Sequence, residues 1–280
     1  MPFFKAIRGV FLLAICLVAT HTVEAQNLCA LASDEIQNVF YIPQIGHGTD
    51  TLGNRVDTKI RILNFQGVET VTATVVSCGD AGELALLRSD LGESTAQVDI
   101  TLEPGGTAAI QSLNNDPDNE LAVGYAGIIT SDSLGISVLF NIVDAQGNLT
   151  STDVRPAPLV TRASFFVEAG DGVNTGVAIL LPPNALDSSE VGLRVRDSDG
   201  TINDKSCFTM EPGDRISKFV TEIVPGLASL EVLGGGLTLS GAIEVYSNVP
   251  VALMPLRQEG IVITTESVFP PRLDVSAVCP

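Results

Sequence analysis

Histidine, the side chain that most often carries acid–base catalysis, is scarce in this sequence. Of its two histidines, only His47 lies beyond the N-terminal signal described below, and it stands between Gly46 and Gly48, as expected of a solvated turn. No Gly-x-Ser-x-Gly, His-Glu-x-x-His, phosphate-binding or Cys-x-x-Cys motif is present. Hydrolysis by paired carboxylates stays open, although nothing selects a pair. We therefore predict no catalytic residues, no cofactor-binding residues and no enzymatic activity.

The acidic loops offer oxygen ligands of the kind that calcium prefers. One candidate site combines four closely spaced donors, Asp197, Asp199, Asn203 and Asp204. A similar cluster in the first half of the chain comprises Asn114, Asn115, Asp116, Asp118 and Glu120. Neither cluster has the full spacing of a recognised calcium loop, and Asp-Ser-Asp-Gly is also an ordinary hairpin turn. Calcium is the one cofactor that the sequence suggests.

The sequence contains 5 cysteines, of which Cys16 belongs to the N-terminal signal. The other four are Cys29, Cys78, Cys207 and Cys279. Four cysteines in an exported chain predict two disulfides, with three alternative pairings, and free buried thiols are the competing interpretation. We prefer Cys29 with Cys78 and Cys207 with Cys279, because each pair would fasten a terminal extension to the nearer domain.

Residues 1–25 have the form of a secretory signal peptide. Lys5 and Arg8 precede an apolar run over residues 10–19, and Val23-Glu24-Ala25 suits cleavage before Gln26. A membrane anchor is the alternative, but the run is about half the roughly 20 residues that span a bilayer. Lipidation at Cys16 is a minor alternative, because the bulky Ile15 precedes it. We expect a secreted, extracellular or periplasmic protein with no transmembrane segment after cleavage.

Composition and charge narrow the class of protein. Hydrophobic residues make up 45% of the chain and charged residues 17%, which favours a folded chain over a disordered one. The 26 glycines and 15 prolines are typical of turn-rich β structure. The formal net charge of −18 would repel nucleic acid and anionic lipid, so we expect no nucleic-acid partner.

The two halves of the chain repeat the same order of segments, each with alternating apolar residues and similar turn signals. The matched pairs are 41–48 with 165–172, 57–63 with 174–180, 71–75 with 191–195, 102–105 with 210–213, and 124–139 with 241–256. Each copy holds about seven short strands, the sequence form of a β-sandwich. Loop lengths differ between the copies while the strands persist.

The repeat divides the chain into a signal peptide (1–25), an N-terminal extension (26–39), two β-sandwich domains (40–160 and 161–272) and a C-terminal tail (273–280). The join, residues 155–161, is short and rich in proline, so it would not act as a flexible tether. We predict an all-β fold of two tandem Ig-like sandwiches with a restricted mutual orientation.

Several motifs carry a resemblance to a known kind of protein. They include the opening strand at 165–166, the Arg196–Gly200 hairpin, the Glu-Pro-Gly turns and the closing strand at 256–258. Together they resemble an uncharacterised tandem β-sandwich repeat, Ig-like or adhesin-like, of secreted bacterial proteins. The resemblance covers residues 40–271 and implies a surface module with no catalytic residues to carry over.

Three classes of function follow. A non-catalytic binding or adhesion module is favoured, because sandwiches present loops and strand edges to a protein or cell-surface partner without reactive groups. A structural subunit of a cell-surface or extracellular assembly is the alternative, and a hydrolase using paired carboxylates is the remote one. The sequence alone identifies neither the ligand nor the oligomeric state.

Overall fold

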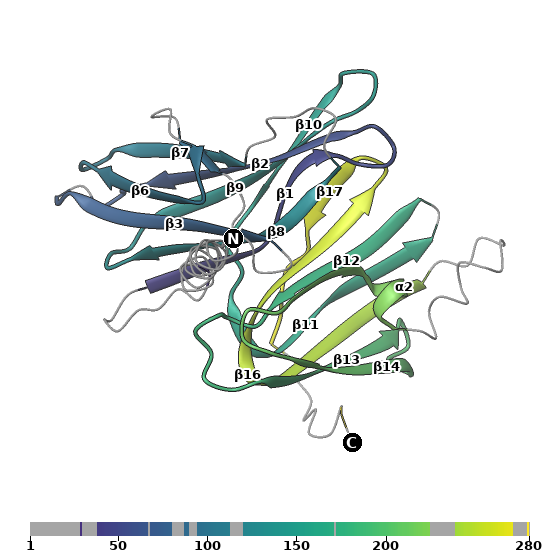
Figure 1. Ribbon diagram of the computed structural model, residues 1–280. Helices are drawn as coiled ribbons and strands as arrows, with labels where there is room; N and C mark the ends of the chain where they lie inside the picture. The colour runs from purple at the N-terminus through teal and green to yellow at the C-terminus, as the bar shows by residue number, and fades with distance from the viewer. Residues whose placement is uncertain are drawn as a thin grey trace, which may run out of the picture.

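The structure is a computed structural model that describes residues 29, 38–66, 68–79, 87–89, 94–112, 120–170, 172–224, 239–270 and 279. The signal peptide expected at residues 1–25 lies outside these residues, as do most of the N-terminal extension and the C-terminal tail. The described chain is all-β and forms two separate curled antiparallel sheets. Figure 1 shows one sheet in the purple-to-teal half of the chain and the other in the green-to-yellow half.

Domain 1 consists of ten strands in two layers. They are β1 (Asn38–Thr49), β2 (Arg55–Leu63), β3 (Val71–Gly79), β4 (Leu87–Ser89), β5 (Ser94–Thr95), β6 (Gln97–Leu102), β7 (Thr107–Ser112), β8 (Ala122–Thr130), β9 (Gly135–Val143) and β10 (Leu149–Val154). One layer has the order β1-β8-β3-β6 and the other β10-β9-β2-β7-β4-β5. The end of β1 crosses to the second layer, where Gly48 pairs with Val56 of β2.

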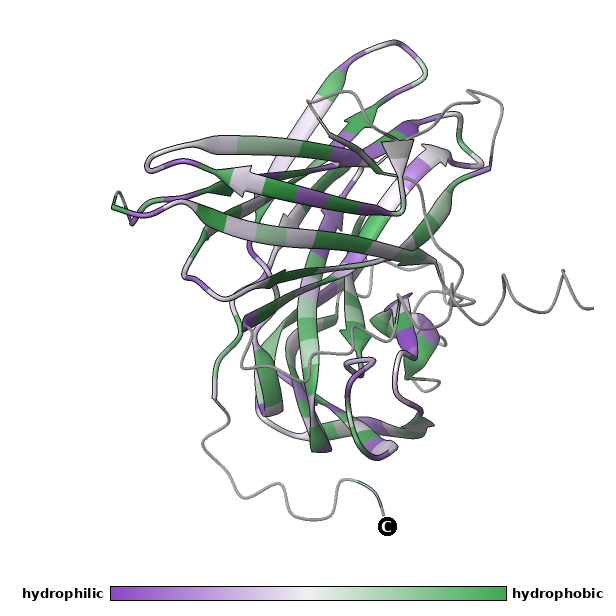
Figure 2. Cartoon of the chain, turned by 60° about the vertical axis from the view of Figure 1, so that its left-hand side comes forward, coloured by the Kyte–Doolittle hydropathy of each residue, from purple (hydrophilic) through white to green (hydrophobic). Residues whose placement is uncertain are grey.

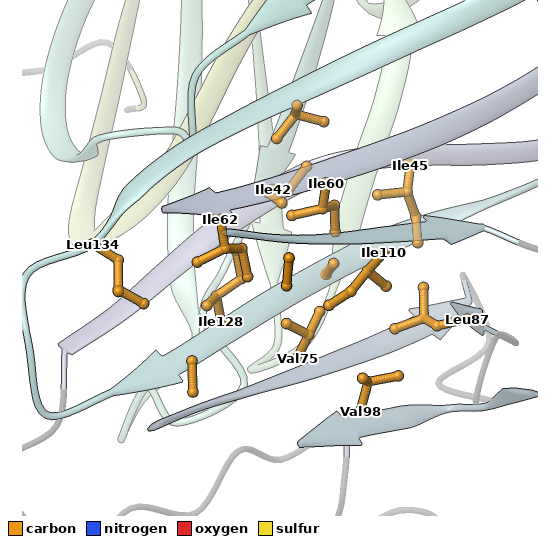
Figure 3. Packing of buried hydrophobic residues seen from close by; sticks show 14 of the residues in the cluster. Ile42, Ile45, Ile60, Ile62, Val75, Leu87, Val98, Ile110, Ile128 and Leu134 are labelled. Carbon is orange, nitrogen blue, oxygen red and sulfur yellow. The ribbon is translucent and has the colours of Figure 1, made fainter. Parts of the chain in front are cut away.

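The core of domain 1 lies between these layers because alternate residues of each strand are apolar. Along β6 the side chains alternate strictly between buried and more exposed, as expected for a sheet with one face against a core. Figure 3 shows isoleucine, leucine and valine side chains from both layers interdigitating, with Ile42 and Val75 on one layer and Ile60 and Ile110 on the other. These side chains are almost completely buried.

Domain 2 repeats this arrangement with fewer, longer strands. They are β11 (Leu159–Gly170), β12 (Val173–Leu180), β13 (Ser189–Asp197), β14 (Ile202–Met210), β15 (Arg215–Phe219), β16 (Leu239–Glu259) and β17 (Val262–Thr265), with one short helix, α2 (Val220–Ile223). β16 passes through both layers. Its first half lies between β11 and β13, and its second half pairs with β12 and β17.

The two domains share one strand order. The layer β1-β8-β3-β6 corresponds to β11-β16-β13-β14, and β10-β9-β2-β7 corresponds to β17-β16-β12-β15. Details of the turns also coincide, since Gly105 donates its N–H to the carbonyl of Asn64 and Gly213 donates to that of Leu181, both at 3.0 Å. The sequence repeat is therefore a repeat of topology.

Two of the matched segments are shifted by two residues relative to the sequence alignment. The hydroxyl of Thr58 bonds the backbone of Gly46, and that of Thr175 bonds the backbone of Glu168. Gly46 is thus the counterpart of Glu168 and not of Gly170. The match of β3 to β13 also shifts by two residues. Gly79 pairs with Gly124, and Asp197 pairs with the equivalent glycine, Gly241, so Gly79 is the counterpart of Asp197. A shift of two keeps every side chain on its own face, so the apolar pattern could not reveal it.

The domains meet along an apolar interface. β12 and the second half of β16 bury one face in the core of domain 2, through residues such as Val177 and Leu253. Their other face contacts domain 1, where Ala178 and Met254 join its core and Leu180 packs with Tyr41 and Tyr125. This double burial explains why residues 177–181 form a continuous apolar run. Figure 2 shows the strands where the domains meet as mostly green.

The connection between the domains is short and held on both sides. β10 of domain 1 ends at Val154, and β11, which pairs with β16, begins at Leu159. Ala157 donates its N–H to the carbonyl of Tyr41 at 2.8 Å, and the carbonyl of Pro158 accepts from Leu253 at 3.3 Å. The linker is therefore bonded to both domains.

Candidate functional site

A cleft of about 570 Å³ opens between the two domains at one end of their interface. Domain 1 contributes the β1–β2 hairpin, the start of β8 and part of β9. Domain 2 contributes β12, β15, α2 and the β16–β17 hairpin. The volume lies within the range of typical ligand sites in proteins.

The walls of the cleft are mainly apolar. The apolar side chains that line them are Val56, Leu121, Val123, Phe140, Ile142, Val177, Phe219, Leu256, Ile261 and Ile263. Phe140 and Ile142 are buried and extend the core of domain 1 to the cleft, while most of the others are half-buried. Two hairpins form the rim, where Leu52 of the β1–β2 turn lines the cleft and is 77% exposed, and Ile261 of the β16–β17 hairpin lines it and is half-buried.

The carboxylates of the cleft are committed to local structure. Asp50 Oδ1 accepts the N–H groups of Leu52 and Asn54, each at 2.8 Å, and so closes the β1–β2 turn. Glu222 Oε2 accepts the N–H of Phe219 at 2.8 Å, as in a capping box at the start of α2. Both carboxylates are thus accounted for by local turn and helix-start geometry.

The positive charge in the cleft belongs to Lys218 of β15. Its side chain is exposed, and no partner of its ammonium group is found in the part of the chain that the structure describes. The neighbouring Arg215 is different, because its guanidinium donates to Gln44 Oε1 and to the carbonyl of Pro43. Arg215 therefore fastens the domains together, whereas Lys218 is available to a ligand.

A buried amide oxygen lies beside the cleft. Asn174 Oδ1 is inaccessible to solvent and has no hydrogen-bond partner among the residues that the structure describes. Asn174 lines a smaller recess of about 360 Å³, which shares Phe219, Gln258 and Gly260 with the cleft. A buried acceptor without a donor is costly, so this oxygen suits a donor supplied from outside the chain.

His47 lies on β1, where it pairs with Ala122 of β8. Burial lowers the pKa of its imidazole below the ordinary value, so the ring is neutral at neutral pH. It is half-buried within a strand rather than placed in a solvated turn, which corrects the sequence-based expectation. It does not line the cleft.

The described calcium candidates take part in hairpin structure. Asp197 Oδ1 accepts the N–H groups of Asp199 and Thr201 at 3.0 and 2.8 Å, which closes the β13–β14 hairpin. Asp204 lies further along β14, opposite Val195 and beyond a bulge. Within the described residues no three His, Cys, Asp or Glu side chains could jointly hold a metal ion. The side chain of Asn203 and residues 113–119 of the other acidic cluster lie outside the described part.

The hairpin of Asp197 has two counterparts in domain 1. Asp50 and Asp144 each accept two backbone N–H groups in the same way, and each turn has a glycine with positive φ three residues later. This is a turn followed by a glycine bulge, a common way to close a hairpin. The side-chain hydrogen bond from Asn148, together with the backbone N–H bonds, lowers the pKa of Asp144. The acidic residues at these positions are therefore explained by turn geometry.

The four cysteines form two disulfides, Cys29–Cys78 and Cys207–Cys279, with Cα–Cα distances of 6.0 and 5.8 Å. These are the pairs preferred from the sequence. Cys29 and Cys78 are buried next to the domain interface, whereas Cys207 is exposed on β14. Each disulfide fastens a terminal segment to a domain.

Sequence reasoning missed the cleft and a cluster of ionic side chains on domain 2. On the outer face of β13 and β16, Arg194 and Arg196 flank the buried carboxylate of Glu244, with N–O distances of 2.5 and 3.1 Å. Residues two apart on a strand share a face, which is a signal that the sequence does contain. The apolar run at 177–181 was a signal for the interface that borders the cleft.

The described residues include no helix long and apolar enough to cross a membrane. Comparison with known proteins adds little: no family model matches the chain, and no curated protein matches it. Among solved structures, a match is found with an anti-sigma factor domain-containing protein from Clostridium clariflavum. It is 10% identical, the alignment covers 78% of this chain and 82% of that chain, and the TM-score is 0.13. A TM-score this low carries no argument about fold or function.

Proposed function

We propose that this chain is an exported, non-catalytic binding module, Ig-like or adhesin-like, that holds a partner protein in the cleft between its two domains. The cleft carries the proposal, because it combines apolar walls with a few polar groups at its edge. Two disulfides support export, since such bonds persist in oxidising compartments. The commitment of Asp50 and Glu222 to backbone amides supports a non-catalytic role.

The interface between the domains supports a preformed site. Tyr41 of domain 1 donates its hydroxyl to Asn184 Oδ1 of domain 2 at 2.9 Å, and Arg215 reaches back from domain 2 to Gln44. Together with the buried apolar contacts, these bonds hold both walls of the cleft in place. A preformed cleft binds with little loss of conformational entropy.

The alternative function is a structural subunit whose copies would assemble by repeating the contact between the two domains. The residues on the outer faces of the domains do not suit such a contact. Val76 and Cys78, which face domain 2, have Arg194 and Arg196 as counterparts in domain 2. Ala178 and Met254, which face domain 1, have Arg61 and Ser137 as counterparts in domain 1. These arginines pair with Glu244 and Asp153, and taking such ion pairs out of water into an apolar interface would cost on the order of several kcal/mol of desolvation. The interdomain contact is thus suited to two domains and not to an array.

Photo-crosslinking in the cells that produce the protein tests the proposed function. A photoreactive amino acid replaces Ile261 in the cleft or, as a control, the exposed Thr107 on β7. We expect a discrete crosslinked species outside the cytoplasm from position 261 only. The same products from both positions, or none from position 261, would contradict the proposal. Crosslinking between copies of the chain would instead support the assembly alternative.

A further inference from the structure

We propose that the partner presents to this cleft an exposed loop that combines apolar side chains with a carboxylate, and that Lys218 is the counter-ion of that carboxylate. This inference rests on the proposed function and specifies the chemistry of its partner. It draws on three features of the cleft: its rim, its charge and its unpaired acceptor.

The rim favours a protein over a small amphiphile. Leu52, in the β1–β2 turn, lines the cleft and is 77% exposed, and Ile261 of the β16–β17 hairpin lines it and is half-buried. A small molecule against the walls would leave much of the Leu52 side chain in water, whereas a protein surface would cover it along with the walls. Exposed apolar side chains around a concave site are typical of protein-binding surfaces.

The exposed ammonium group of Lys218 favours a partner loop that carries a carboxylate. The chain carries a net charge of −18, so an acidic partner would ordinarily be repelled. In the cleft, however, the carboxylates of Asp50 and Glu222 are held in their own turns by the N–H groups they accept, while Lys218 is exposed and has no partner among the described residues. A carboxylate at this point would gain a charge-assisted hydrogen bond beside an apolar surface.

The unpaired oxygen of Asn174 favours a loop with accessible backbone N–H groups. It lies in the recess that adjoins the cleft at Phe219 and Gln258, and one donated hydrogen bond would satisfy it. A loop supplies such donors because its backbone is not bonded within a helix or sheet. One short segment of the partner can thus supply the apolar side chain, the carboxylate and the backbone N–H donor.

Selection from a random-peptide phage library, panned on the full exported chain, tests this inference. We expect enriched peptides with apolar residues next to Asp or Glu. Lys218→Glu should weaken a selected synthetic peptide at least tenfold, while Lys205→Glu, an exposed lysine of β14, should change its affinity less than twofold. Replacing the peptide's carboxylate by lysine should restore binding to the Lys218→Glu chain.

The outcomes separate this inference from the proposed function. Leu52→Asp and Ile261→Asp alter exposed or half-buried positions at hairpin turns, so the chain should still fold, which thermal melts would check. If these variants abolish binding but Lys218→Glu does not, the cleft is the site and the acidic loop is overturned. If they leave binding unchanged, the cleft itself is overturned. Enrichment of no peptide together with binding of dodecanoate would show a small-molecule site and overturn the loop.

Discussion

At the scale of single residues, two glycines show how closely the strands approach in both domains. A Cβ atom on Gly124 would lie 2.1 Å from the carbonyl oxygen of Cys78, and one on Gly241 would lie 1.9 Å from that of Arg196. Both contacts involve backbone atoms, which cannot move aside as a flexible side chain would. The two positions are equivalent, so the repeat preserves a packing requirement as well as a strand order.

We predict that Gly124→Ala and Gly241→Ala each lower the free energy of unfolding by at least about 3 kcal/mol, because the backbone of the neighbouring strand must shift. Gly135→Ala is the matched control, since its nearest contact would be Leu63 Cβ at an ordinary 3.4 Å. Urea unfolding of the three variants measures the difference. Equal stabilities of all three would refute the close approach.

Two buried tyrosines at the domain interface predict a dependence of stability on alkaline pH. Burial raises the pKa of Tyr41 and of Tyr125 from 10.0 to about 12, with the charge of Tyr125 also raising that of Tyr41. Because the folded state binds these protons more tightly, their contribution is complete below pH 10 and is lost as the pH rises towards 12. We expect a loss on the order of 2 kcal/mol per tyrosine.

Chemical unfolding across this pH range, with tyrosinate absorbance as a second signal, measures the effect. Tyr41→Phe and Tyr125→Phe should each reduce the alkaline loss, because phenylalanine has no proton to release. An unfolding midpoint that is the same at pH 10 and near pH 12 would show that the tyrosines are not buried as described.

At the scale of elements, the Asp-x-x-Gly hairpins explain the acidic loops. The carboxylate of Asp197 accepts two N–H groups of its own turn, whereas the carboxylate of Asp199 accepts none from the described residues of that turn. We predict that Asp197→Ala lowers stability by about 1 kcal/mol, the usual value of such bonds, and that Asp199→Ala has little effect. Thermal melts of the unmodified chain should superpose with calcium and with chelator. A midpoint that calcium raises by several degrees would support a metal site and contradict this prediction.

The two disulfides differ in their accessibility, and this predicts an order of reduction. Cys207 is exposed, while Cys29 and Cys78 are buried against the interface. Under native conditions a mild reductant should therefore open Cys207–Cys279 first, because exchange needs access of a thiolate to sulfur. Alkylation followed by mass spectrometry identifies which cysteines react. Faster reaction of Cys29 and Cys78 would contradict the buried position of their disulfide.

At the scale of the whole molecule, the two domains share buried surface and should unfold together. Leu180, Ala252 and Met254 belong to strands of domain 2 but are buried against domain 1. We predict a single calorimetric transition for the unmodified chain. Leu180→Asp should lower its midpoint and separate the transition into two, because a charge at the interface disfavours docking. Leu186→Asp, at a position that is 97% exposed, should change neither.

The sequence by itself determined the all-β class, the tandem repeat and the face on which most strand residues lie. These properties follow from local patterns, namely alternation of apolar residues and glycine or proline at turns. The sequence could not determine how the residues of the two copies correspond, because Gly46 is matched to Glu168 only by the hydrogen bonds of Thr58 and Thr175. A pattern that repeats every two residues looks the same after a shift of two.

Only the tertiary structure decided how the domains meet and what the acidic side chains do. The second apolar face of β12 and β16 packs against domain 1, and the cleft opens at one end of this contact. Lys218 of β15 lies exposed among the residues that line it. The same Asp-rich pattern suits a calcium loop and a hairpin, and the difference depends on whether backbone amides or a metal ion satisfy the carboxylate of Asp197. Such choices depend on contacts between segments distant in sequence, which no local pattern contains.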